Sequence, residues 1–478
     1  MASTLIREAD WVVAYDPGIR GHVYRRNCDV VFTDDRITHV GPGFLEKPDR
    51  TIDGRSLMVM PGLIDLHSHP MFEPLSKGWN DEIASQKLWG SALYEIIPTF
   101  LPELSDVAAS ATVAYGELLL SGTTTTVDIA FRWDGWIDLF AKSGMRGVLA
   151  PMYRSAYWYT KNGHSVEYEW NEDAGRRDMD AALALIDKAA QHPSGRLSGM
   201  LAPAQVDTCT AELLRASVEE AKRRGLKCQV HAAQSVVEFH EMTRRHGKTP
   251  IEWMASLGLL GPDMIIGHGV FLDHHTSVSV WPTKNDLSLL ADSGAFVAHC
   301  PTQFLRKGVA MQSLGRYLAR GVGIGIGTDT YPHNMIEEMR AAVVTSRLAS
   351  GNVWDLRTSD VFNAATLGGA AALGRDDIGR IAPGAKADLV LIDVTHPTMR
   401  PVRDPIRSLI YAAAERPVRA VFVDGRAVVE DRKLVTLDLE TASAEVEQAQ
   451  RRIEAAVAGR DWAGRDHAEI SPYTYELV

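Results

Sequence analysis

Short apolar runs alternate with amphipathic stretches from about residue 61 to residue 370. Eight runs read as buried strands, among them GLIDLH, TTTTVDIA, MRGVLAPMY, MIIGHGVFL and GVGIGIGTD. The segments between them, such as TAELLRASVEEAKRRG, are apolar at i, i+3 and i+4 and end at a glycine, which is typical of helices. Eight strands separated by helices fit a parallel (β/α)8 TIM-like barrel better than an open doubly wound sheet, although alternation alone admits both.

Near both ends of the chain the sequence pattern is different and is typical of strands. DWVVAYDP and CDVVFTDDRITHVGPG lie near the start, and KADLVLIDV and VRAVFVDGRAVVEDRKLV follow residue 370. The sequence therefore predicts an α/β protein in which residues 1–60 and 371–478 form a small composite β-sandwich and residues 61–370 form the barrel. A last amphipathic stretch, ETASAEVEQAQRRIEAAVAGRD, predicts a helix that caps the sandwich or meets a second subunit.

The charge and composition of the chain limit the kinds of partner that the protein is expected to bind. The 478 residues carry a net charge of −11, and a nucleic acid or an anionic membrane would call for a clustered basic surface instead. Charged residues interrupt the first apolar stretch before it reaches signal-peptide length, and no apolar run approaches the roughly 20 residues of a membrane span. We therefore expect a cytoplasmic protein with a small-molecule partner. The four cysteines form no C-x-x-C pair, so neither a disulfide framework nor a thiolate zinc site is indicated.

Candidate metal-binding side chains stand at the ends of the predicted strands. His67 and His69 are two residues apart in GLIDLHSHP, so both imidazoles point to one face of the strand. Taken alone, such a pair is more often two surface histidines. However, three other runs also end in a possible ligand, namely His231, His268 and Asp329. All strands of a parallel barrel open onto one face, so these groups converge there, and imidazole with carboxylate suits zinc or iron(II) with room for a water molecule.

The chain resembles the amidohydrolase superfamily, and within it the ATZ/TRZ-like branch of cytosine, guanine and S-adenosylhomocysteine deaminases and triazine hydrolases. The matching motifs run in family order over nearly the whole chain: PGLIDLHSH, SGTTT, VHAAQS, IGHG, VAHCPT, GTDT and ATLGGAAALG followed by IGRIAPGAKADLVLID. The resemblance implies the barrel with its terminal sandwich.

The resemblance also implies roles for individual residues. One divalent metal ion, zinc or alternatively iron(II), would be held by His67, His69, His231 and Asp329, while His268 would contact the attacked group or the water. Binuclear members carry a carboxylated lysine on the fourth strand, and the corresponding stretch RLSGMLAPAQVDT has none. The resemblance therefore favours a single ion.

Gln234 departs from the pattern of the deaminases, which place a proton-carrying glutamate three residues after the histidine of this strand. An amide forms hydrogen bonds but cannot carry a proton at ordinary pH. Three explanations stay open. The leaving group departs with little protonation; Asp329 moves the proton while His268 stabilises the developing charge; or the chain has lost turnover and binds a small molecule only. Glu73 could replace the missing acid if its loop folds back.

Other residues are candidate substrate contacts. Gln205 stands where family members often have histidine, and two altered polar groups in one pocket suggest a changed substrate. His299 and His333 follow strand ends, although a packed structural histidine is as plausible for the first. Trp79 lies in a segment that would cover the mouth, where it either stacks on a flat substrate or anchors the loop.

The sequence thus predicts a metal-dependent amidohydrolase in which activated water attacks an sp2 carbon and cleaves a non-peptide C–N or C–halide bond of a small heterocyclic or amide-like substrate. His268 and Asp329 are the predicted catalytic residues. The alternative within enzymes is a deaminase of an N-heterocycle that uses an acid other than residue 234. The alternative outside enzymes is a metal-containing binding protein. Family habit favours a homodimer or larger homo-oligomer.

Overall fold

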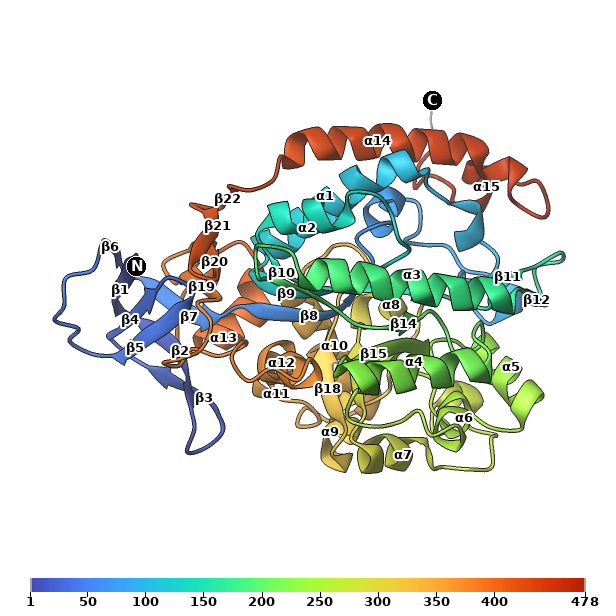
Figure 1. Ribbon diagram of the computed structural model, residues 1–478, viewed down its shortest axis with the longest axis horizontal. Coiled ribbons are helices and arrows are strands. Elements are labelled where there is room, and N and C mark those ends of the chain that lie inside the picture. The colour runs from blue at the N-terminus through green and yellow to red at the C-terminus, as the bar shows by residue number, and fades with distance from the viewer. Residues whose placement is uncertain (1, 477–478) are drawn as a thin grey trace.

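The computed structural model describes residues 2–476, and its centre is a closed barrel of parallel strands (Figure 1). In chain order the barrel strands are β8 (Leu63–Ser68), β9 (Thr123–Ala130), β10 (Arg146–Tyr153), β13 (Leu197–Gly199) continued by β14 (Ala202–Pro203), β15 (Cys228–Ala232), β16 (Met264–His268), β17 (Phe296–His299) and β18 (Gly323–Ile326). Every pairing between them is parallel. Isolated bridges close the two remaining gaps: Ser68 with Asp329 in one, and Leu201 with Cys228 and Gln205 with His231 in the other. The predicted fold class is confirmed.

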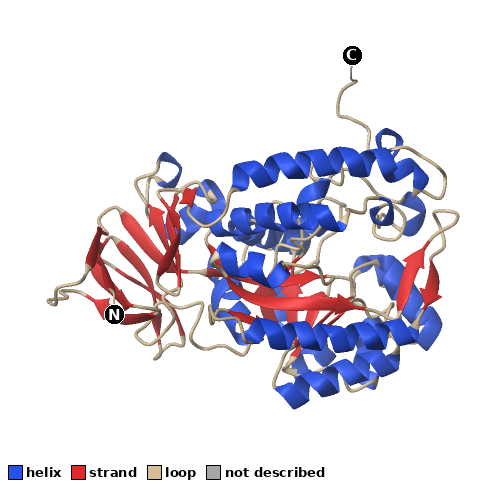
Figure 2. Cartoon of the chain, turned by 45° about the horizontal axis from the view of Figure 1, so that its top comes forward, coloured by secondary structure: helices blue, strands red, loops and turns tan. Residues whose placement is uncertain are grey.

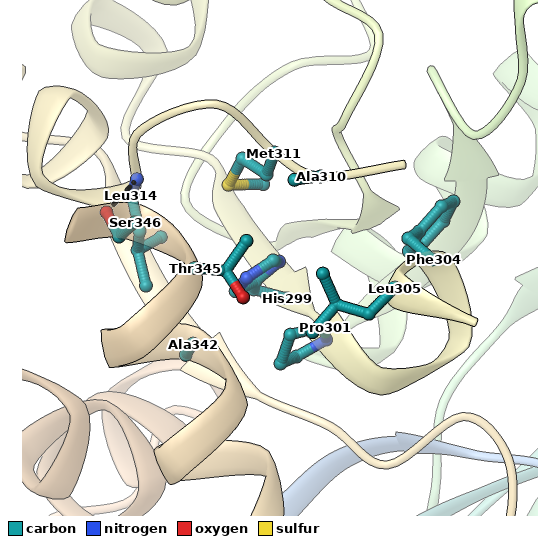
Figure 3. A pocket seen from close by; sticks show the side chains of 10 residues that line it. All are labelled: His299, Pro301, Phe304, Leu305, Ala310, Met311, Leu314, Ala342, Thr345 and Ser346. Atoms are coloured by element: carbon teal, nitrogen blue, oxygen red, sulfur yellow. Dashed lines mark hydrogen bonds between the residues drawn. The ribbon is translucent and has the colours of Figure 1, made fainter. Parts of the chain in front are cut away.

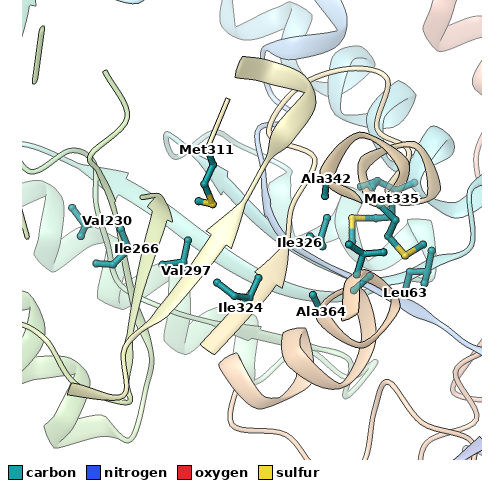
Figure 4. Packing of buried hydrophobic residues seen from close by; sticks show 14 of the residues in the cluster. Leu63, Val230, Ile266, Val297, Met311, Ile324, Ile326, Met335, Ala342 and Ala364 are labelled. Carbon is teal, nitrogen blue, oxygen red and sulfur yellow. The ribbon is translucent and has the colours of Figure 1, made fainter. Parts of the chain in front are cut away.

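Alternation along each strand divides its side chains between two cores. In β10, Val148, Ala150 and Met152 point into the barrel, whereas Leu149 and Tyr153 pack outward against helices. The outward side chains of later strands form a continuous layer with the helices that follow them (Figure 4). Burying both faces explains why these strands read as uninterrupted apolar runs.

Helices follow the barrel strands on the outside. They are α1 (Val107–Leu120), α2 (Trp136–Ser143), α3 (Glu172–Ala190), α4 (Ala211–Arg224), α5 (Val236–His246), α6 (Pro250–Ser256), α7 (Asp286–Ser293), α8 (Pro301–Leu305), α9 (Leu314–Arg320), α10 (Met335–Ser350), α11 (Thr358–Asn363) and α12 (Gly369–Ala372). Helix α4 illustrates how the local sequence sets the ends of these helices. The Thr210 side chain caps its start, and Gly225, at φ 65°, ends it in the left-handed region.

Two sheets lie beside the barrel (Figure 2), and the larger one combines strands from both ends of the chain. One sheet has the order β5 (Arg36–Gly41), β4 (Cys28–Thr33), β1 (Ser3–Ala9), β6 (Arg50–Asp53). The other has the order β22 (Lys433–Leu434), β21 (Arg426–Glu430), β20 (Val418–Val423), β19 (Leu389–Asp393), β7 (Leu57–Pro61), β2 (Trp11–Asp16), β3 (Gly21–Arg25). Only Gly62 separates β7 from the first barrel strand.

The C-terminal helix α14 (Leu439–Ala456) packs on the barrel side, not on the sandwich (Figure 1). It contacts α1 and the short helix η1 (Glu73–Ser76). Its buried Ala449 and Ile453 join Leu75 and Trp79 in one apolar cluster, so the loop after β8 provides the surface that the helix covers. The expected cap on the sandwich is therefore not seen. Within residues 2–476, no helix has the length and apolar character needed to cross a membrane.

Candidate active site

His67 and His69 enter the barrel mouth from the end of β8, and each ring is held by its Nδ1 atom. His69 Nδ1 donates to the Ile129 carbonyl at 2.7 Å, and His67 Nδ1 donates to the side-chain oxygen of Gln229. Gln229 is itself fixed, because its amide donates to the Leu66 carbonyl at 3.1 Å. With Nδ1 protonated in both rings, each Nε2 carries a free lone pair.

His231 and Asp329 complete a compact group of donor atoms. His231 Nδ1 donates to the Ala204 carbonyl at 2.6 Å, and its Nε2 lies 3.1 Å from His69 Nε2. Asp329 Oδ1 lies 3.3 Å from His69 Nε2 and 3.5 Å from His67 Nε2. The His67 Nε2 atom is buried and has no hydrogen-bond partner among the described residues. Unprotonated nitrogens that face one another beside a carboxylate repel unless a cation lies between them, so this donor set fits a divalent metal ion.

The surrounding imidazoles are uncharged near neutral pH. Burial lowers the pKa of His69 to about 4, that of His268 to about 3 and that of His299 to about 4. Cys300 lies with His67 and His268 in a second group of possible ligands, but burial raises its pKa well above the usual value and keeps it a thiol. The histidine group that includes His69 and His231 is therefore the better candidate metal centre.

Residues 58–428 match the Amidohydrolase family. The chain belongs to the amidohydrolase family. The predicted superfamily and its ATZ/TRZ branch are thus confirmed, as is the prediction of a metal-dependent hydrolase; the alternative of a binding protein without turnover loses its support.

Several curated proteins and solved structures are similar to this amidohydrolase over nearly its whole length. The 5-methylthioadenosine/S-adenosylhomocysteine deaminase of Thermococcus kodakarensis is 31% identical over 86% of this chain and 92% of its own. An adenosine deaminase from Xanthomonas campestris, solved with bound zinc, has a TM-score of 0.82 at 25% identity over 95% of this chain and 99% of its own. Atrazine chlorohydrolase from Arthrobacter aurescens TC1, complexed with zinc, has a TM-score of 0.78 at 23% identity over 94% and 100%, and shares the fold.

Two glutamines stand beside the histidine group of the amidohydrolase. Gln234 follows β15, is 9% exposed, and its side-chain nitrogen has no hydrogen-bond partner among the described residues. Its backbone is fixed because the Gln234 N–H donates to the Glu238 carboxylate at 3.2 Å. Gln205 pairs with His231 across the strands, and the Thr208 hydroxyl donates to its side-chain oxygen at 3.0 Å. Both side chains therefore present N–H donors.

The loop after β8 folds back and brings Glu73 to the amidohydrolase site. The Glu73 carboxylate accepts a hydrogen bond from the hydroxyl of Thr330, the residue next to Asp329. Burial, together with the negative charge of Asp329, raises the pKa of Glu73 to about 7. Its position four residues after His69 was the only sequence signal, because the direction of the loop is set by contacts far away in the chain.

Two of the predicted substrate contacts, Trp79 and His333, are buried among other side chains. The Trp79 ring is 3% exposed and stacks on Phe100, with ring centroids 4.2 Å apart, so the structure gives it the loop-anchoring position. His333 is fully buried, with Nδ1 3.5 Å from the Glu117 carboxylate. A substrate contact by either ring stays a prediction.

His299 ends β17 and lines a small cavity of about 10 Å³ with Met311 and Leu314 (Figure 3). That volume holds about one water molecule, so this cavity is not a substrate pocket. The His299 Nδ1 atom has no hydrogen-bond partner among the described residues.

Gln229, which orients His67, was not predicted from the sequence. Its position two residues before His231 on the same strand face was the available signal.

Proposed function

We propose that the Nε2 atoms of His67, His69 and His231 and the carboxylate of Asp329 hold one divalent metal ion, which is zinc, with iron(II) as the alternative. The observation that carries the proposal is the 3.1 Å approach of the His69 and His231 Nε2 atoms, because the Nδ1 atoms of both rings are already committed to backbone carbonyls. Nitrogen and oxygen donors in this number leave a coordination position free.

The proposed reaction is hydrolysis at an sp2 carbon of a small nitrogen heterocycle, with an amine or a halide as the leaving group. Relatives named as deaminases of adenosine derivatives and as an atrazine chlorohydrolase support this substrate class. A metal ion bound by this donor set supplies a Lewis acid that makes water nucleophilic near neutral pH.

Other side chains have their own roles in the proposed reaction. Asp329 accepts the proton of the attacking water at its carboxylate. Neutral His268 hydrogen-bonds to the group that gains negative charge; its buried Nδ1 has no hydrogen-bond partner among residues 2–476. The Gln234 and Gln205 amides orient the ring by donating to its nitrogen or carbonyl acceptors, and the Nδ1 atom of His299 is a further candidate contact.

Deamination is the second candidate, and the position of Glu73 favours it. The Glu73 carboxylate accepts a hydrogen bond from the hydroxyl of Thr330, and Thr330 follows Asp329 directly in the chain. Glu73 would accept the proton of the water and return it to the leaving nitrogen, as the glutamate absent at Gln234 does in deaminases.

A turnover screen tests both candidates. Purified protein of known metal content is assayed on aminopurines, aminopyrimidines, substituted triazines, amides and ureas, beside Gln234→Glu and the exposed control Gln191→Glu. Wild-type product release that Gln234→Glu lowers supports a hydrolase adapted to the amide. Activity that appears only in Gln234→Glu contradicts the proposal and marks a disabled deaminase. Released ammonia, another amine or halide identifies the bond cleaved.

We also propose that two copies associate into a homodimer. The exposed apolar side chains of Leu348 and Trp354, at 80% and 76% exposure on and after α10, support an association surface. Sedimentation of the wild type and of Trp354→Ser tests this, and a monomeric wild type contradicts it.

A further inference from the structure

The amino-terminal end of the barrel contains a second cavity, which is much larger than the one beside His299. Its volume is about 380 Å³, within the range of roughly 300–1,000 Å³ that is usual for small-molecule sites. Arg146 and Ser198 line it from the first residues of β10 and β13, and Lys227 and Asp263 directly precede β15 and β16. The candidate metal ligands stand at the carboxyl ends of barrel strands, so the cavity and the metal centre lie at opposite ends of the barrel.

One wall of this cavity is apolar. Val148 and Met200 belong to the inner cluster of the barrel, and Leu373 and Ile378 come from the segment after α12. These side chains offer a surface on which the organic part of a ligand can be buried. The cavity therefore suits a small molecule better than a bare inorganic ion.

Two arginines that line the cavity keep free hydrogen-bond donors. Arg146 donates to Asp388 and Asp424 through Nε and Nη2, and its Nη1 has no hydrogen-bond partner among the described residues. Arg375 donates to Asp377 through Nε at 2.7 Å, and within residues 2–476 neither of its Nη nitrogens is bonded. Each guanidinium thus has at least one nitrogen available to a ligand, although a carboxylate already pairs with its charge.

Two further donors belong to the same cavity. Thr125 lies on the same face of β9 as Val127 of the inner cluster, is 1% exposed, and its hydroxyl has no hydrogen-bond partner in the part of the chain that the structure describes. Lys227 Nζ donates to Asp263 at 2.7 Å and to the Pro262 carbonyl at 3.1 Å, which leaves one of its three N–H groups free.

Acceptors are scarce beside these donors. Asp263 is the one carboxylate among the described residues that line the cavity, and Lys227 already pairs with it. Three cationic side chains and a buried hydroxyl therefore have unused donors. Buried donors without acceptors are unfavourable, and an anion rich in acceptor oxygens would remove that cost.

We infer that this cavity binds a small molecule through a phosphate group. A phosphate monoester has a charge of about −1.5 to −2 near pH 7 and three strong acceptor oxygens, which matches free donors on the separate side chains of Arg146, Lys227 and Arg375. A carboxylate has two oxygens and would leave part of this donor set unused. The apolar wall takes the organic part of the ligand. The inference does not depend on the proposed reaction, because the cavity is at the other end of the barrel.

Calorimetric titration of the metal-loaded protein tests the ligand class. The probes are phenyl phosphate, inorganic phosphate, benzoate and phenol. We expect phenyl phosphate to bind about tenfold more tightly than phenol, because phenol lacks the charge-assisted hydrogen bonds. It should also bind more tightly than inorganic phosphate, which cannot use the apolar wall, and more tightly than benzoate.

Substitutions at the cavity test its location. Lys227→Gln and Arg375→Gln should each weaken phenyl phosphate binding about tenfold, and Thr125→Val should weaken it about threefold. Arg55→Gln is the matched control, because Arg55 also pairs with an aspartate two residues away, Asp53 at 2.6 Å, but is exposed outside the cavity. The control should bind phenyl phosphate like the wild type.

Each contrary result overturns a stated part of the inference. Benzoate that binds more tightly than phenyl phosphate overturns the phosphate assignment, and inorganic phosphate that binds as tightly as phenyl phosphate overturns the role of the apolar wall. Phenyl phosphate binding that both Lys227→Gln and Arg375→Gln leave unchanged belongs to another place, such as the metal centre, and overturns the site. Absence of measurable binding at millimolar concentrations overturns it as well.

Discussion

The Thr330 hydroxyl donates a hydrogen bond to the Glu73 carboxylate and ties the loop after the first barrel strand to the loop after the last one. Strands β8 and β18 are neighbours in the closed barrel, so this bond crosses the seam at the level of Asp329. An acid thereby lies beside the candidate metal ligands although residue 234 is a glutamine. We therefore predict that Glu73 supplies the proton-carrying acid that is missing at residue 234.

Glu73→Gln tests whether this acid moves protons. If Glu73 is the general base, we expect kcat to fall about 10²- to 10⁴-fold while metal content stays the same, since the amide still accepts the Thr330 hydrogen bond. The active form is the ionised carboxylate and its pKa is raised to about 7, so wild-type kcat should rise with pH through 7. The variant should lose that rise. A kcat within threefold of wild type would assign proton transfer to Asp329 alone.

Metal retention should depend on pH in a predictable direction. Burial lowers the pKa of His69 to about 4, so its imidazole stays neutral and able to bind metal well below pH 6. We expect zinc content, measured by mass spectrometry after dialysis at stepped pH, to stay constant from pH 8 to about 5 and to fall as the pH approaches 4. His231→Ala should lose the ion at every pH. Complete wild-type loss above pH 6 would contradict the proposed ligand set.

The contact between Gln450 and the loop after β8 should affect the substrate site from outside. The Gln450 amide donates to the carbonyls of Leu75 and Lys77, each at 2.8 Å, and so holds the helix that begins with Glu73. Gln450→Ala should raise KM several-fold with unchanged zinc and lower stability by about 1–2 kcal/mol. Gln450→Glu, which cannot donate, should behave like the alanine variant. The exposed neighbour Arg451→Ala is the control; equal effects of both would exclude a specific role.

Arg146 links the barrel to the sandwich through a buried ion cluster. It bonds Asp388 at 2.9 and 3.1 Å and Asp424 at 2.5 Å, and it is 4% exposed. Arg146→Met would leave the buried Asp388 without its cation, whereas Asp424 keeps Lys386 at 3.3 Å, so we expect a loss of about 3–5 kcal/mol in the free energy of unfolding. Arg419→Met, which removes an exposed partner of Asp431, should cost at most about 1 kcal/mol. Chemical denaturation measures both, and equal losses would contradict the prediction.

The sequence predicted the barrel, the terminal strands of the sandwich and the grouping of His67, His69, His231 and Asp329. These follow from local periodicity and from one topological rule, since the carboxyl ends of parallel strands open onto a single face. The same reasoning could not decide the roles of Trp79 and His333. Their segments lie in the loops after β8 and β18, where no repeating pattern tells which side chains turn inward.

The sequence by itself determined which strands exist and which metal-binding side chains they carry, because alternation of two residues is a short-range property of the chain. Tertiary structure alone decided that Glu73 meets Thr330, that Gln229 orients His67 and that α14 covers the loop after β8. Each of these contacts joins segments whose relative position depends on closure of the barrel and on burial of apolar loop side chains, and both are long-range properties.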